Sequence, residues 1–195
     1  MNNKTKLFLA LAVGRAACGF CMLTGIIFLT WLTENLGKTG LSLSEMGNTV
    51  GVSILTVLFS SKVVLKYTAT IPYKILVLNS SAFLIDAGAV YFLGDICPYV
   101  VLVSGVMSVM CDRTYIQSRK VLFNRVYHGD ELTLIGNRLD VIGIIAALGG
   151  SSLAIVVPAT TTALAVVMVI IAIILTISNY YQIKYLLMLQ PAEIE

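Results

Sequence analysis

Charged residues are scarce in this chain. Only 12% of its 195 residues are Asp, Glu, Lys or Arg, whereas 58% are hydrophobic. Soluble domains carry about 25% charged residues, so this chain has more apolar surface than one soluble core can bury. Lipid is therefore the expected solvent. The net charge of +3 is small and spread through the predicted loops, which argues against a nucleic-acid-binding patch.

Histidine and cysteine are scarce as well. His128 is the only histidine and has no Cys or His cluster around it. Cys18 and Cys21 lie inside an apolar run, where the thiolate of a redox motif is disfavoured, and Cys97 and Cys111 are too far apart along another run to bridge. No disulfide framework, metal site or cofactor is predicted. An enzyme is not expected either, because no nucleophile and base converge at membrane depth.

Apolar runs are what the chain has in abundance. A transmembrane helix needs about 20 mostly apolar residues, and six runs approach that length. The first is too long for a signal peptide and is predicted to be retained. The sequence thus predicts an all-α membrane protein, a single six-helix transmembrane domain over residues 1–195. The predicted spans are about 7–32, 46–65, 73–94, 96–117, 135–157 and 162–187.

The basic residues predict the orientation of these spans. Eleven Lys and Arg residues would lie on one side of the membrane, and only Lys38 on the other, near Glu34, Glu45 and Asp95. Loops rich in Lys and Arg face the cytoplasm. Both termini and the 118–134 loop are therefore predicted to be cytoplasmic, in a plasma membrane such as the bacterial inner membrane.

Three of the charged residues in the predicted spans, Arg15, Asp86 and Asp112, are unusual for their depth. A charge near the middle of a transmembrane helix costs about 2.5–3.5 kcal/mol on insertion scales, so Arg15 should have a partner. Asp112 lies at a similar depth, which favours an Arg15–Asp112 pair; Asp86 lies deeper and could reach towards Arg15 or be neutral. These residues are either structural clamps or substrate- or proton-binding groups in a central cavity.

Small residues recur in the predicted spans, among them Gly19 in the first and Gly143, Gly149 and Gly150 in the fifth. Small residues allow helix backbones to approach closely in membranes. Simple helix packing explains them, and in a transporter such packing would also support sliding of helices.

The segment from Arg119 to Val157 resembles the cytoplasmic connection between the fourth and fifth helices of major facilitator superfamily exporters. The matching features are Asp130-Glu131-Leu132, Asn137 and the small-residue segment 148–154. The stretch LSLSEMGNTVG resembles the entry to the second helix of that family. The resemblance covers nearly the whole chain, but only the N-terminal six-helix half of a normal member.

The resemblance implies two inverted three-helix repeats, with a cavity lined by the first and fourth helices, which would carry Arg15 and Asp112. The loop after the second helix departs from the family, because Leu65 takes the place of the gating Asp and Lys66 that of the following basic residue. Cytoplasmic loop or gating roles are expected for Lys66, Arg113, Arg119, Arg138 and Asp140.

Two functions remain open at this point. The first is a half-size transporter of a small molecule, working by alternating access as a homodimer or with a second transporter half; a homodimer with twofold symmetry would rebuild a twelve-helix shape. The second is a membrane protein of the immunity or exclusion type, which uses the same half fold for interaction and does not transport.

Overall fold

The described part of the chain is helical. The computed structural model describes residues 2–35, 72–97, 99–104, 120–121 and 123–189, together with isolated positions between 42 and 55. Within these residues there is no β-strand, and four long helices form the fold: α1 (Asn3–Asn35), α3 (Pro72–Leu93), α5 (Gly129–Leu153) and α6 (Thr161–Leu189). A short helical segment covers 99–104.

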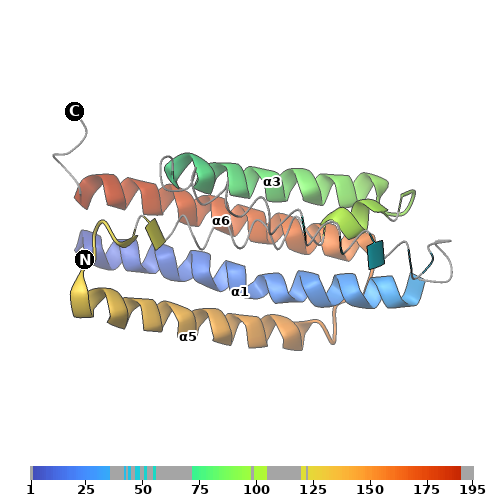
Figure 1. Cartoon of the computed structure of the whole chain (residues 1–195), viewed down its shortest axis with the longest axis horizontal. Helices are drawn as coiled ribbons and strands as arrows, with labels where there is room; N and C mark the ends of the chain where they lie inside the picture. The colour runs from blue at the N-terminus through green and yellow to red at the C-terminus, as the bar shows by residue number, and fades with distance from the viewer. Residues whose placement is uncertain are drawn as a thin grey trace.

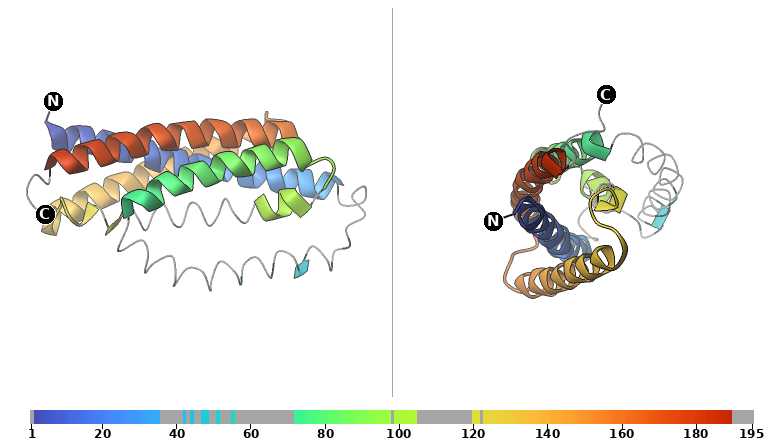
Figure 2. Two further views of the ribbon diagram at one scale, coloured as in Figure 1. Left: turned by 90° about the horizontal axis from the view of Figure 1, so that it is seen from above. Right: turned by 90° about the vertical axis from the view of Figure 1, so that its left-hand side faces the viewer.

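The four long helices pack as a curved row in the order α5, α1, α6, α3 (Figure 1). The end-on view in Figure 2 shows this row as an arc. Helices α1, α3 and α5 run in one direction and α6 in the other, so the start of α1 lies beside the end of α6. Lys6 Nζ there lies 5.8 Å from the centroid of the Tyr185 ring. We call this the N-terminal end of the bundle, and the opposite one the far end.

Three of the described helices, α1, α5 and α6, are long and apolar enough to cross a membrane; within α3 the apolar stretch Ser80–Leu93 is shorter. Large apolar side chains are also exposed on the outer faces, including Ile85 at 74%, Ile145 at 64% and Leu148 at 64%. Exposed apolar patches of this extent are rare on soluble monomers. The prediction of a helical membrane protein is therefore supported by both the helices and their surfaces.

The predicted spans agree best with the structure where an apolar run has clear ends. The first, third and sixth predicted spans fall on α1, α3 and α6. The fifth differs, because α5 begins at Gly129 and ends at Leu153 rather than covering 135–157. Its polar first turn carries Asp130 and Glu131, which the helix dipole stabilises at that end. The last six residues of the predicted loop 118–134 therefore belong to α5, whereas the second span and most of the fourth lie outside the described residues.

Helix α6 is the central helix of the described bundle. Its buried residues recur at alternating spacings of three and four, from Thr161 through Met168, Leu175 and Gln182 to Leu186. That spacing keeps one stripe facing neighbouring helices, and here the stripe meets α1 on one side and α3 on the other. At the far end, Thr161 Oγ1 donates a hydrogen bond of 2.8 Å to Asp95 Oδ1 and joins the start of α6 to the turn after α3.

Helices α1 and α5 meet along a seam of small residues. A Cβ atom placed on Gly19 of α1 would lie 2.5 Å from the carbonyl oxygen of Gly143 and 2.7 Å from Cβ of Ala146. One placed on Gly150 would lie 3.4 Å from the backbone nitrogen of Leu23. The glycines therefore let the two backbones approach more closely than side chains would allow. We call Gly19, Gly143, Ala146 and Gly150 the glycine seam.

Candidate functional site

Arg15 lies on α1 and extends onto the glycine seam. Its Nε atom is 3.7 Å from Asp140 Oδ1 on α5. The side chain of Arg15 is 19% exposed, whereas that of Asp140 is 63% exposed. A Cβ atom on Gly143 would lie 2.5 Å from Arg15 Cζ and 2.6 Å from Nε. The missing side chain at Gly143 is thus what allows the guanidinium to lie against the α5 backbone.

The Arg15–Asp140 pair is a loose one. Charge-assisted N–H···O bonds between a guanidinium and a carboxylate are about 2.7–2.9 Å long, so 3.7 Å is an ionic contact without a hydrogen bond. Arg15 Nε is buried and donates no hydrogen bond to any described residue. The guanidinium is therefore held in place, while part of its hydrogen-bonding capacity is unused.

The pair lies well inside the predicted membrane-spanning region. Arg15 is eight residues beyond Leu7, where the apolar part of α1 begins, or about 12 Å along the helix. Asp140 is five residues beyond Ile135 on α5, or about 8 Å. Both helices run in the same direction from the N-terminal end, so the two charges reach similar depths.

Asp86 belongs to a separate polar contact on the other side of α6. Ser104 Oγ donates a hydrogen bond of 3.0 Å to Asp86 Oδ2 and lies 3.7 Å from Met168 Sδ. Ser104 is 1% exposed, so this contact joins α3, the 99–104 segment and α6 inside the bundle. Among the described residues Asp86 makes no ion pair, and α6 lies between its helix and that of Arg15.

A buried polar cluster on α6 is absent from the sequence-based candidates. Ser178 Oγ donates a 2.7 Å hydrogen bond to the Ala10 carbonyl of α1, and Asn179 Nδ2 donates a 2.9 Å bond to the Leu76 carbonyl of α3. Gln182 Nε2 donates to Ser178 Oγ at 2.7 Å. Three amide and hydroxyl side chains on one face of an otherwise apolar helix are the signal that identifies such a cluster. It fixes α6 between its two neighbours.

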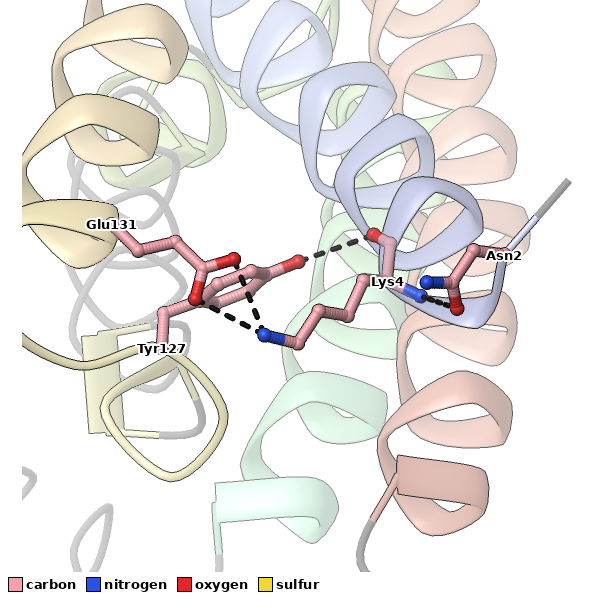
Figure 3. A network of polar contacts seen from close by, with 4 residues as sticks. All are labelled: Asn2, Lys4, Tyr127 and Glu131. Carbon is pink, nitrogen blue, oxygen red and sulfur yellow. Dashed lines mark hydrogen bonds and ion pairs between the residues drawn. The ribbon is translucent and has the colours of Figure 1, made fainter.

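A network at the N-terminal end ties α1 to α5 (Figure 3). Lys4 Nζ lies 3.1 Å from Glu131 Oε2 and 5.6 Å from the centroid of the Tyr127 ring. Tyr127 Oη donates a 3.2 Å hydrogen bond to the Lys4 carbonyl. Tyr127 is 1% exposed, and burial, aided by the negative charge of Glu131, raises the pKa of Tyr127 to about 12.

The remaining sequence-based candidates have mixed outcomes. Arg138 is exposed on α5 and makes no ion pair with another described residue. Asp112, Lys66, Arg113 and Arg119 lie outside the described residues, and so does the predicted Arg15–Asp112 pair. Among the described residues the ionic neighbour of Arg15 is Asp140, for which the sequence predicts a cytoplasmic loop or gating role.

In the described part of the chain, no group of three or more His, Cys, Asp or Glu residues could hold a metal ion. His128 is exposed at the position preceding α5. The thiol of Cys21 donates to the Ala17 carbonyl at 3.6 Å, as a packing residue within a helix does.

Comparison with known proteins adds no relative to this description. No protein-family model, curated protein or solved structure matches the chain. The fold and the polar contacts define the class, a helical membrane protein, and Arg15 and Asp140 join two of its apolar helices through an ionic contact.

Proposed function

We propose that this chain is a half-size transporter of a small molecule, resembling one half of a major facilitator, which works by alternating access as a homodimer. It would cross the bacterial inner membrane six times, with both termini in the cytoplasm. The proposal includes no enzymatic activity and no cofactor. The observation that carries it is the exposure of Asp140.

Asp140 is 63% exposed in the single chain although it lies at membrane depth. A carboxylate facing hydrocarbon is costly, and acidic residues within transmembrane helices almost always face protein or a water-filled cavity. Arg15 covers only part of the carboxylate, at a separation of 3.7 Å. A second copy of the chain, or water held between two copies, would supply the rest of its environment.

The place of α5 in the bundle supports the same proposal. Helix α5 contacts α1 but forms one edge of the described row, and only 17% of its most apolar window is buried. A parallel second copy related by a twofold axis could cover such an edge with the same surface. The two halves of complete major facilitators are parallel repeats about an axis along the membrane normal, which a homodimer would reproduce.

The glycine seam is suited to movement of α1 against α5. Its residues are small, as in the close approach of Gly19 to the Gly143 carbonyl, and the Arg15 side chain lies across it at Gly143. Alternating access in such transporters is largely a rocking of helix groups around a fixed site. In this proposal α1 and α5 shift along the seam, and the contact between Arg15 and Asp140 changes as they do.

Accessibility of position 140 to water tests the proposal. Asp140→Cys and Val141→Cys are made in a background whose four cysteines are replaced by alanine. Val141 is the matched control, because it lies at nearly the same depth and is also 54% exposed. A small, membrane-impermeant, charged thiol reagent should modify Cys at 140 and not at 141. If neither position reacts, the water-filled cavity of the proposal does not exist; if both react, α5 does not lie in lipid.

A further inference from the structure

We propose that Arg15 binds the substrate through a carboxylate or phosphate group, and that Asp140 occupies this site when the substrate is absent. This inference rests on the proposed transport function and names its substrate class, a small organic anion. It is carried by the geometry of one guanidinium, one carboxylate and one glycine.

Arg15 has an N–H donor, that of its Nε atom, which makes no hydrogen bond to a described residue. A guanidinium carries five N–H donors in a planar fork and stays charged under all physiological conditions. In the described part of the chain Arg15 has a single ionic neighbour, at 3.7 Å, and its buried Nε donates no hydrogen bond. A partly buried cation with an unpaired N–H donor is stabilised by an acceptor that offers two oxygens side by side. Carboxylates and phosphates are the groups with that geometry.

The guanidinium of Arg15 is held in a fixed position. It lies against α5 at Gly143, where a Cβ atom would be 2.5 Å from Arg15 Cζ and 2.8 Å from Nη2. The α5 backbone therefore forms one wall of the site and limits the orientations of the fork. A group that is already oriented loses less conformational entropy when a ligand binds. The Arg15 side chain as a whole is 19% exposed, so it is not fully closed off from a ligand.

Asp140 competes with the substrate anion for Arg15. Its carboxylate neutralises Arg15 without hydrogen bonding to it, and its 63% exposure leaves it room to turn away. A substrate anion that hydrogen bonds to the fork would replace a weaker ionic contact with a stronger one. Binding then releases Asp140, so occupancy of the site changes the charge that α5 presents at the edge of the bundle.

This arrangement predicts effects of opposite sign for the two members of the pair. Asp140→Asn removes the competing charge and should tighten anion binding by about tenfold. Arg15→Gln should abolish binding, and Arg15→Lys, which keeps the charge but loses the planar fork, should weaken it by about tenfold. Asp130→Asn is the matched control, because Asp130 is an exposed acid on the same helix that lies away from the site, and should leave the affinity unchanged.

The experiment measures binding to the purified full-length protein in detergent by calorimetry and by thermal shift. The probes are succinate and citrate for carboxylates, inorganic phosphate and glycerol 3-phosphate for phosphates, and glycerol and choline as neutral and cationic controls. Either the carboxylates or the phosphates should bind, and the class that binds identifies the anionic group that Arg15 recognises. The inference is overturned if no anion binds, or if Asp140→Asn weakens binding as Arg15→Gln does. Should Arg15→Gln not fold, the Arg15→Lys and Asp140→Asn pair decides.

Transport is measured separately, with proteoliposomes and radiolabelled forms of the same probes. Anion binding without uptake or exchange would contradict the proposed function and leave the anion site standing. Uptake of the neutral or cationic probe without anion binding would support the proposed transport function and contradict the assigned substrate class.

Discussion

The guanidinium of Arg15 occupies the space that a side chain at Gly143 would fill. The two residues come from different helices, and a Cβ atom on Gly143 would lie 2.5 Å from Arg15 Cζ. The glycine thus determines both how closely α1 and α5 approach and where the positive charge of Arg15 lies. Changes at Gly143 should therefore affect stability and the site together.

Substitution of Gly143 by Ala tests this relationship. The added methyl group should force Arg15 or the α5 backbone to move, and lower the free energy of unfolding by about 1–3 kcal/mol. Gly136→Ala is the control on the same helix, because a Cβ atom there meets nothing within 4 Å. It should stabilise the protein by about 0.5–1 kcal/mol, through the lower backbone entropy of the unfolded chain. Thermal unfolding in detergent compares the stabilities of the two variants. Equal effects would contradict the close approach of α1 and α5 at Gly143.

The polar cluster on α6 predicts a second contrast. Asn179 is 2% exposed, and its Oδ1 atom accepts no hydrogen bond from a described residue. Asn179→Leu removes one hydrogen bond together with one unsatisfied acceptor, so the free energy of unfolding should change by less than about 1 kcal/mol. Leu175→Asn, one turn away on the same buried stripe, should cost at least about 2 kcal/mol. A large loss in Asn179→Leu would mean that Oδ1 has a partner.

The N-terminal network predicts an order of effects. The Lys4–Glu131 pair is about half exposed on both sides, so Glu131→Gln should cost less than about 1 kcal/mol, and less still at high salt. Tyr127→Phe loses the hydrogen bond to the Lys4 carbonyl and should cost about 1 kcal/mol. Tyr127→Ala empties a position that is 1% exposed and should cost about 3–5 kcal/mol. Chemical denaturation of the three variants measures the loss of free energy of unfolding for each. A larger loss in Glu131→Gln than in Tyr127→Ala would contradict the predicted order.

The pKa of Tyr127 predicts a pH dependence confined to alkaline solution. The folded protein raises this pKa from 10.0 to about 12. Below pH 10 the phenol is neutral in both states, and its contribution to stability is complete. Between pH 10 and 12 the unfolded chain releases the proton first, so stability falls as the pH rises. The difference in free energy of unfolding between wild type and Tyr127→Phe should show this fall. The difference in absorbance at 295 nm between the two folded proteins, which reports the ionised Tyr127 phenol, should titrate near pH 12. A difference that stays constant up to pH 12 would contradict the burial of the phenol.

The sequence predicted the helical membrane class because that class depends on composition and on run length. The ends of α1, α3 and α6 follow from where apolar residues stop. The sequence did not indicate that α5 begins at Gly129, because Gly129, Asp130 and Glu131 are typical of a loop as well as of a polar first turn. Local patterns alone do not distinguish the two cases, because the choice depends on contacts such as that of Glu131 with Lys4.

The site was predicted in part, for a different reason. Depth along a helix can be counted from the sequence, so the need of Arg15 for a partner was foreseeable. Which helix faces Arg15 depends on packing, and the closeness of α1 and α5 arises from Gly19 and Gly143 meeting across the seam. Asp112 and Asp140 each lie five residues from the inner end of a predicted span, and depth alone did not separate them.

The native mass of the purified protein in nanodiscs, with the lipid contribution subtracted, tests the central claim most directly. We expect a complex of two 21.0 kDa chains, in which a second copy covers the α5 edge and Asp140. A monomer in nanodiscs would contradict the homodimeric transporter. A stoichiometric complex with a different membrane protein would also contradict it, and would favour an interaction protein of the immunity or exclusion type.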